Sequence, residues 1–157
     1  MQVSIRKVQV TPVKERWLRN FVQEHHSTPR HLLNSTEDSW TRDKLHVYEI
    51  IDLNTYFSGG GGTPIGVTSF QQITPHLAIK QKTIVAEEFR RMGIGSKVND
   101  MLEDEMRRYG VGKCISHVFD FNLPMIAMLL KKGYKVEAFL TDHHAPGYNE
   151  YIMSKLL

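Results

Sequence analysis

Two glycines one residue apart separate a strand-like run from the most regular helical pattern in the chain, and this feature constrains the fold most strongly. Gly93 and Gly95 lie in the segment "EEFRRMGIGSKV" (87–98), just after Ile84 and Val85. Glycine costs about 1 kcal/mol relative to alanine inside a helix. The pair therefore predicts a turn whose backbone adopts a positive φ or approaches another group closely.

The helix after this turn has the clearest periodicity. Its apolar residues recur at helical spacing and fall on one face, namely Ile94, Val98, Met101, Leu102, Met106 and Tyr109. On the opposite face, Glu103 with Arg107 and Asp104 with Arg108 are expected to form i,i+4 pairs. Gly110 is well placed to end the helix.

The remaining pattern alternates between strands and helices. A helix opened by Pro12 follows the first strand, and a helix capped by Asn122 lies between two later strands. Residues 27–45 are ambiguous, although Ser35 could cap a short helix there. The predicted strands cover residues 3–10, 46–53, 64–73, 76–85, 113–119, 134–141 and 149–156. This order predicts a single mixed α/β domain over residues 1–157.

Composition limits the class of protein. A chain of 157 residues that is 41% hydrophobic and 24% charged can form one soluble domain with a normal core. It has no apolar run of about 18 residues and no signal-peptide pattern at its N-terminus, so no membrane association is expected. A single cysteine, Cys114, allows no intramolecular disulfide and favours a cytoplasmic location.

The charge indicates the partners. The net charge is +3 and the isoelectric point is near 9.0, but the basic residues form no stripe, so nucleic acid is not an expected partner. A modest attraction to an anionic ligand would explain the balance equally well. The sequence does not decide between a monomer and a homodimer.

A turn that joins a strand to a helix can bind phosphate. It directs several unpaired backbone N–H groups to one place, and the helix dipole adds positive potential. Arg90, Arg91 and Ser96 would supply further donors. The same residues could also form an ordinary tight turn with solvated arginines. The sequence has neither the GxxxxGK[ST] loop nor the third glycine of a dinucleotide-binding turn.

The run from Arg90 to Gly95, "RRMGIG", resembles the [Q/R]-x-x-G-x-[G/A] signature of the GNAT acyltransferase superfamily, which also lies between a strand and a helix. The resemblance continues in residues 122–134, which look like the family's N…A…L…GF/Y segment, and in the ending "YNEYIMSKLL". It is strong over about residues 76–157. It implies a mixed, mostly antiparallel sheet with splayed parallel central strands flanked by helices.

The resemblance also implies a reaction. Acetyl-CoA, or another acyl-CoA, would be the cosubstrate, and its acyl group would pass directly to a primary amine of a protein, peptide or small molecule. The backbone of Ile84 and Val85 would pair with the pantetheine arm, and Asn122 would contact pantetheine from the next helix. The pyrophosphate would be held by Arg90, Arg91, Met92, Gly93, Ile94, Gly95 and Ser96.

The general acid is where this chain departs from the family pattern. Many members place a tyrosine seven residues after the helix-capping asparagine, as acid for the CoA thiolate. Leu129 stands at that position and cannot donate a proton. Either another group is the acid or the thiolate leaves with help from water. An alternative function is a domain that binds acyl-CoA without turnover.

The general base is expected on the strand that follows the glycine turn. Members resembling ribosomal-protein alanine acetyltransferases carry a glutamate there, and counting back from Asn122 places His117 at that position. An imidazole can take up a proton near neutral pH. A structural role for His117, an ordered water as the base, and Glu87 or Glu88 as the base are the alternatives.

A pair of adjacent histidines, His143 and His144, lies between the last two predicted strands. It could line the mouth of the acceptor site or form a solvated turn. No set of residues has the sequence spacing of a metal site, so no metal is expected.

Overall fold

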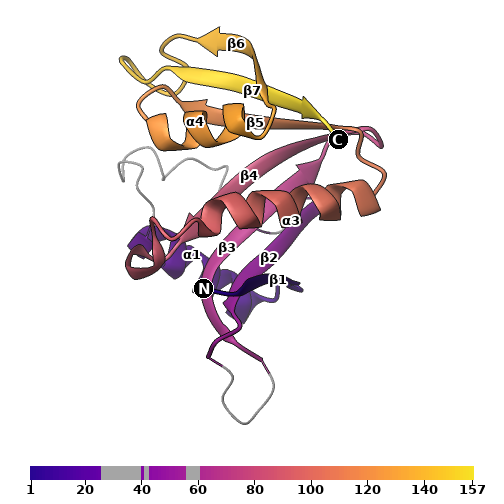
Figure 1. Cartoon of the computed structure of the whole chain (residues 1–157), viewed down its shortest axis with the longest axis vertical. Helices are drawn as coiled ribbons and strands as arrows, with labels where there is room; N and C mark the ends of the chain where they lie inside the picture. Colours follow the sequence, from indigo (N-terminus) through magenta and orange to yellow (C-terminus); the bar gives the residue numbers. More distant parts are fainter. Residues whose placement is uncertain (26–39, 41–42, 56–60) are drawn as a thin grey trace. The chain divides into compact units, whose positions relative to one another are not determined.

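The structure is a computed structural model and describes residues 1–25, 40, 43–55 and 61–157 (Figure 1). The short helix expected from Ser35 lies largely outside these residues. The described strands are β1 (Val3–Lys7), β2 (Leu45–Asp52), β3 (Thr63–Gln72), β4 (Leu77–Val85), β5 (Lys113–Phe119), β6 (Lys135–Leu140) and β7 (Glu150–Leu156). The described helices are α1 (Pro12–His25), α3 (Ile94–Arg108) and α4 (Leu123–Lys131), with a short 3-10 helix η1 (Glu87–Phe89).

The seven described strands form one sheet in the order β1-β2-β3-β4-β5-β7-β6. β4 and β5 are parallel, whereas the pairs β1–β2, β2–β3, β5–β7 and β6–β7 are antiparallel. The expectation of a mixed α/β fold with a mostly antiparallel sheet is confirmed.

The chain divides into two compact units. The first contains Met1–Gln71 and Lys82–Leu102, and the second contains Gln72–Gln81 and Glu103–Leu157. Both β4 and α3 therefore contribute residues to each unit.

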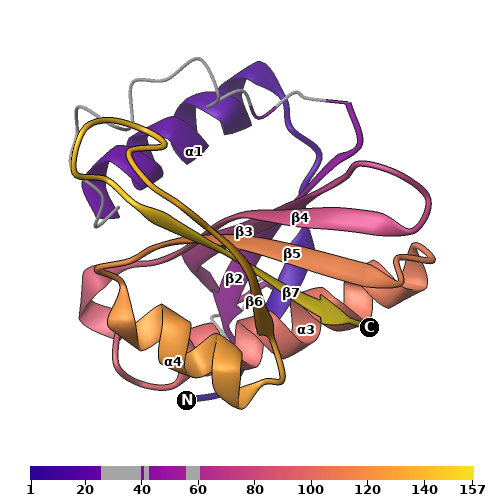
Figure 2. The same ribbon diagram turned by 90° about the horizontal axis from the view of Figure 1, so that it is seen from above.

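In the first unit, helices cover both faces of the sheet (Figure 2). Leu18 and Val22, four residues apart on α1, pack with Val47 of β2 and with β3 on one face. Ile94 and Val98, four residues apart on α3, pack with the opposite face. Because both faces are covered, β2 and β3 each contain six consecutive buried residues, as expected for strands between two layers.

The first unit also buries the ion-paired carboxylate of Glu49. Glu49 lies on β2 directly opposite Arg6 of β1, and its side chain is only 3% exposed. Arg6 Nη2 donates to Glu49 Oε2 at 2.7 Å, and Lys14 Nζ pairs with Oε1. Burial alone would raise the pKa of Glu49, but the hydrogen bonds from these two cations outweigh it and lower that pKa below its ordinary value.

In the second unit, α4 begins and ends as the sequence predicts. Asn122 Oδ1 accepts a hydrogen bond from Met125 N at 3.4 Å, and Pro124 lies in the first turn of the helix. After the helix, Gly133 adopts a φ of +86°. In β5 the residues alternate, so that Cys114, Ser116 and Val118 are buried and His117 is exposed on the opposite face.

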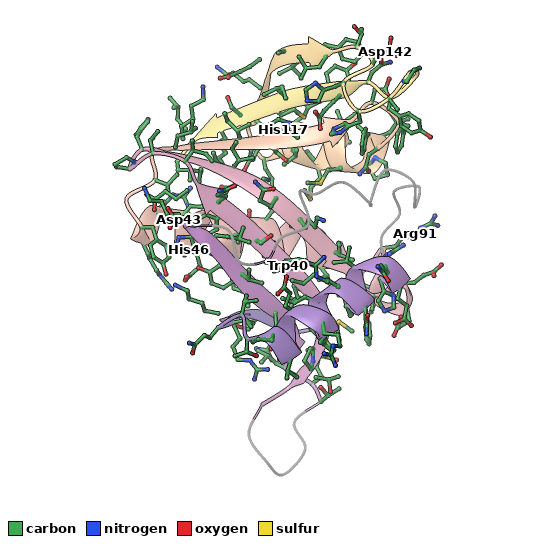
Figure 3. All side chains as sticks on the ribbon, turned by 180° about the vertical axis from the view of Figure 1, so that it is seen from behind. Trp40, Asp43, His46, Arg91, His117 and Asp142 are labelled. Atoms are coloured by element: carbon green, nitrogen blue, oxygen red, sulfur yellow. The ribbon has the colours of Figure 1, made fainter. Side chains whose placement is uncertain are left out.

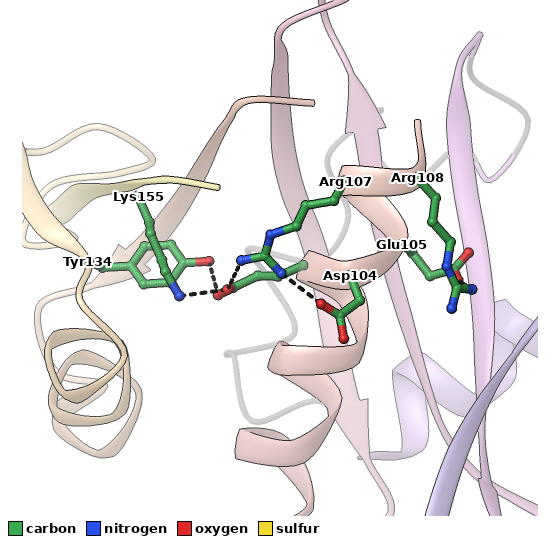
Figure 4. Close-up of polar contacts among 7 residues, drawn as sticks. Asp104, Glu105, Arg107, Arg108, Tyr134 and Lys155 are labelled. Atoms are coloured by element: carbon green, nitrogen blue, oxygen red, sulfur yellow. Dashed lines mark hydrogen bonds and ion pairs between the residues drawn. The ribbon is translucent and has the colours of Figure 1, made fainter. Parts of the chain in front are cut away.

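Of the two predicted ion pairs of α3, one is present and one is wrong. Glu103 does lie 3.6 Å from Arg107, but its side chain is buried. Tyr134 Oη donates to Glu103 Oε1 at 2.9 Å, and Lys155 Nζ donates to Oε2 at 2.7 Å (Figure 4). Asp104 contacts Arg107 instead of the expected partner. Tyr134 follows α4 and Lys155 lies on β7, so helical spacing alone does not reveal these two partners of Glu103.

Candidate functional site

The glycine turn has the backbone that the sequence predicts. After β4 ends at Val85, the chain passes through η1 and two residues with positive φ, Arg91 at 61° and Gly93 at 74°. α3 then begins at Ile94. Gly93 thus occupies a left-handed conformation that favours glycine.

Both glycines face open space. Apart from the adjacent residues and the backbone of its own helix, a Cβ built on Gly93 or on Gly95 would meet no atom within 4 Å. By contrast, a Cβ on Gly66 in β3 would lie 2.5 Å from the carbonyl oxygen of Ile84, so this glycine serves close strand packing. The first turn of α3 has no acidic residue. The start of α3 therefore offers free backbone donors, positive dipole potential and room for an anion.

The two arginines of the turn have different environments. Arg90 Nε donates to the carbonyl oxygen of Val85 at 3.0 Å, and its Nη2 donates to that of His25. Arg90 therefore ties the turn to β4 and to the end of α1. Arg91 is exposed, and Figure 3 labels it. Of the two, Arg91 has the side chain better placed to contact a ligand from solvent.

The other predicted phosphate-binding residues differ in exposure. Met92 is 49% exposed, whereas the Ile94 side chain is 2% exposed and belongs to the core, so Ile94 can offer only backbone atoms. Ser96 is half-buried in the first turn of α3. The structure brings these residues together in the turn with Gly93 and Gly95.

The end of β4 contains the two residues expected to contact pantetheine. The ladder between β4 and β5 covers Leu77–Lys80 and Lys113–Ser116, whereas β4 continues to Val85. The Ile84 side chain is buried in the core of the first unit. Any contact of Ile84 with a ligand would therefore use its backbone, as the sequence predicts.

Asn122 and His117 belong to the second unit. Asn122 is half-buried, and its Oδ1 caps α4. His117 lies on β5 with 38% of its side chain exposed, and Figure 3 labels it. Its Nδ1 is 3.2 Å from Oε2 of Glu150, the first residue of β7.

Glu150 is a functional candidate that the sequence does not reveal. The β5–β7 register places Glu150 opposite Phe119 and Ile152 opposite His117, so Glu150 and His117 are diagonal neighbours on one face. The Glu150 side chain is 5% exposed. Burial alone would raise its pKa, but hydrogen bonds and charge interactions with His117 and His144 outweigh this and lower it.

The other residues considered for the general acid or base differ from His117 in burial or in position. Leu129 is fully buried in α4, so it is a core residue. Glu87 and Glu88 are exposed in η1, within the first unit. His143 and His144 lie in the loop after β6, and both approach Glu150.

Comparison with known proteins identifies the family. The sequence model of the GNAT acetyltransferase family matches residues 13–134, which is most of the chain. The chain belongs to the GNAT acetyltransferase family. It is accordingly an acyl-CoA-dependent N-acyltransferase, and this match confirms the resemblance carried by the glycine turn.

Solved structures with the same fold include GNAT enzymes of different named activity. The ribosomal-protein-S18-alanine N-acetyltransferase of Escherichia coli is 15% identical with a TM-score of 0.73, over 99% of this chain and 94% of that one. The aminoglycoside 6'-N-acetyltransferase of Enterococcus faecium is 13% identical with a TM-score of 0.69, over 98% and 96%. A GNAT family acetyltransferase of Elizabethkingia anophelis, solved with acetyl-CoA bound, is 10% identical with a TM-score of 0.70, over 99% and 98%.

No curated protein matches the sequence. None of the helices within the described residues combines the length and the apolar character needed to cross a lipid bilayer.

Proposed function

We propose that this GNAT protein transfers an acetyl group from acetyl-CoA to a primary amine on a protein, a peptide or a small molecule. The observation that carries the proposal is the open space over Gly93 and Gly95 at the start of a helix whose first turn has no acid. A pyrophosphate fits this environment because backbone N–H groups and the helix dipole both favour anions.

The residues of the turn have distinct roles in this proposal. The backbone from Gly93 to Ser96 binds the pyrophosphate, and Arg91 adds a charged donor. Arg90 holds the turn in place through its bond to Val85 O. The backbone of Ile84 and Val85, beyond the end of the β4–β5 ladder, pairs with pantetheine. Asn122 contacts pantetheine as well.

We assign His117 as the general base. An ionised carboxylate can only accept hydrogen bonds, so the proton between His117 and Glu150 lies on Nδ1 of the imidazole. In the neutral form of the ring, Nε2 then has a lone pair and can take the ammonium proton of the acceptor, directly or through one water. Glu150 then orients the ring and stabilises the imidazolium. Acetyl-CoA supplies the activated thioester, so no covalent enzyme intermediate is required.

A turnover assay tests the proposal. Purified protein is given acetyl-CoA and a panel of primary amines, including peptides with free N-termini, lysine peptides, polyamines and aminoglycosides, and release of CoA thiol is followed. Amine-dependent release supports transfer. Acetyl-CoA binding without release for any amine would favour the alternative of a binding domain without turnover.

A thermal shift assay tests the cofactor directly. Acetyl-CoA at about 100 times its dissociation constant would stabilise the fold by about 2.7 kcal/mol, which is several degrees in melting temperature. Adenosine should give no such shift, since it lacks the pyrophosphate and pantetheine. No shift at millimolar acetyl-CoA would contradict the proposed site.

We also propose a cytoplasmic location, because the thiol of Cys114 is free and buried.

A further inference from the structure

The buried glutamates among the described residues differ in what neutralises them. Glu49, Glu103 and Glu150 each have side chains no more than 5% exposed. Glu49 pairs with an arginine and a lysine, and so does Glu103. Among the described residues, the ion-pair partners of Glu150 are only histidines, which are charged only when protonated. A buried carboxylate is costly unless it is paired and hydrogen-bonded, and the groups that pair with Glu150 are imidazoles, which are also metal ligands.

The ligand atoms around Glu150 are arranged for such a cation. His144 Nε2 lies 3.3 Å from Glu150 Oε1, and His143 Nε2 lies 3.8 Å from Oε2. One donor atom from each of the three residues falls within 4.8 Å of the others. In a tetrahedral zinc site with bonds of about 2.0–2.1 Å, donor atoms are about 3.3–3.4 Å apart. Small side-chain rotations would therefore bring all three donors onto one ion.

The loop that carries the histidines is held by its own hydrogen bonds. Asp142, labelled in Figure 3, adopts a φ of 50°, and its Oδ1 accepts from Gly147 N at 2.6 Å. His143 N donates to Tyr148 O at 3.2 Å. The ring of Phe119 packs edge-on against His144 at 5.1 Å. These contacts present two consecutive histidines to the same carboxylate, although consecutive side chains usually diverge.

We infer that His143, His144 and Glu150 form a binding site for one divalent transition-metal ion of the zinc class. Two imidazole nitrogens and a carboxylate suit Zn²⁺, Co²⁺, Ni²⁺ or Cu²⁺, whereas Mg²⁺ and Ca²⁺ prefer oxygen ligands alone. Three protein ligands leave a fourth position for water or another small ligand. His117 is not a ligand in this set, and its bond to Oε2 orients the carboxylate.

This site goes beyond the proposed acetyl transfer and does not depend on it. Metal binding requires His144 Nε2 to present a lone pair to the ion, so a proton on this nitrogen must leave or move to Nδ1. The sequence does not predict the site, since the ligand spacing H-H-x5-E becomes a cluster only through the loop and the start of β7.

Cobalt titration tests the site. Untagged protein, freed of metal by a chelator, is titrated with Co²⁺ while its visible d–d absorption is recorded, and Zn²⁺ is then added as a competitor. We expect one Co²⁺ per chain with the intense absorption of a tetrahedral site, and displacement by Zn²⁺. His143→Ala, His144→Ala and Glu150→Gln should each weaken Co²⁺ binding at least about tenfold, since even an indirect partner of a metal ligand is worth that much.

The controls make the result decisive. His76→Ala removes another exposed histidine of the second unit and should leave Co²⁺ binding unchanged. His143→Gln and His144→Gln provide replacements closer in size, and circular dichroism verifies that each variant is folded. Failure of the wild-type protein to bind Co²⁺ at millimolar concentration would overturn the inference. So would unchanged binding in folded variants of both histidines.

Discussion

The glycine turn and the Glu150 cluster (His143, His144 and Glu150) are proposed to bind ions of opposite charge. The first uses mainly backbone groups and the second uses side chains. The turn offers backbone N–H groups at a helix start, with open space where side chains are missing. The Glu150 cluster offers the buried carboxylate of Glu150 at the start of β7 and two imidazoles from the preceding loop. A backbone site should be sensitive to added bulk, whereas a side-chain site should be sensitive to truncation.

The largest expected effect comes from adding a side chain to the turn. Gly95→Glu would fill the open space with bulk and negative charge, so acetyl-CoA binding should be abolished, with affinity lowered by about 10²-fold or more. Isothermal calorimetry with acetyl-CoA measures this. Position 95 has a negative φ and no close neighbour, so the fold should persist.

Gly95→Ala is the matched control, since it adds one methyl group without charge, and it should lose far less affinity than Gly95→Glu. Gly93 is a poor position for this test because its positive φ would strain any replacement. Unchanged acetyl-CoA affinity in a folded Gly95→Glu protein would remove the glycine turn as the cofactor site.

The next largest effect is expected when a side chain of the second unit is removed. His117→Ala is expected to lower kcat about 10²-fold, the usual range for losing a general base, with little change in the KM for acetyl-CoA. Glu150→Gln should lower kcat less, because the imidazole remains and only its orientation and charge stabilisation are weakened. Steady-state kinetics with the best acceptor of the amine panel measures both.

His76→Ala is the control here as well and should keep the wild-type kcat. If His117→Ala kept full turnover, an ordered water would become the better candidate for the base.

These two regions also differ in how far the sequence predicts them. The turn is local in sequence, because glycine spacing, flanking arginines and the following helical pattern all lie within residues 84–98. The positive φ at Gly93 is accordingly one of the two alternatives that the glycines predict. Glu150 is 33 residues from His117 and becomes its neighbour only through the β5–β7 register. Periodicity assigns both strands but cannot supply that register.

The same limit explains Glu103. Helical spacing correctly predicts that Glu103 lies next to Arg107. The ends of α3 are also close to those predicted. The pattern nevertheless assigns Glu103 to the exposed face, because a polar residue is normally solvated. Only the packing of Tyr134 and Lys155 around it makes burial of this carboxylate favourable.

A third prediction uses Glu49, whose cationic partners are permanent. Glu49→Gln removes the charge that Arg6 and Lys14 share, so the free energy of unfolding at neutral pH should fall by about 1–3 kcal/mol. Urea denaturation measures this. Thr68→Val, which removes a partly buried hydrogen bond between β3 and Thr83 of β4 in the same unit, is a control for general loss of polar contacts.

The pH dependence identifies the ion pair. The folded-state pKa of Glu49 lies below its ordinary value of 4.5, so the unfolded chain binds more protons just below pH 4.5. The stabilisation is complete above that pH and is lost as the pH falls through the folded-state pKa. The free energy of unfolding of Glu49→Gln should therefore fall less than that of the wild type as the pH is lowered through this range. Parallel pH curves for the two proteins would show that Glu49 is not held ionised by its partners.

The smallest effect is expected for Tyr134→Phe, which removes one hydrogen bond from Glu103 and leaves its cationic partners in place (Figure 4). A hydrogen bond to a buried charged group contributes about 1.5–3 kcal/mol, but Lys155 continues to donate to the carboxylate at 2.7 Å, so a loss of about 1 kcal/mol is expected. Lys155→Met should cost more, since it removes a charge from a buried pair. If Tyr134→Phe were the more destabilising of the two, the hydroxyl rather than the cation would hold Glu103, and permanent cations would not be what distinguishes Glu103 from Glu150.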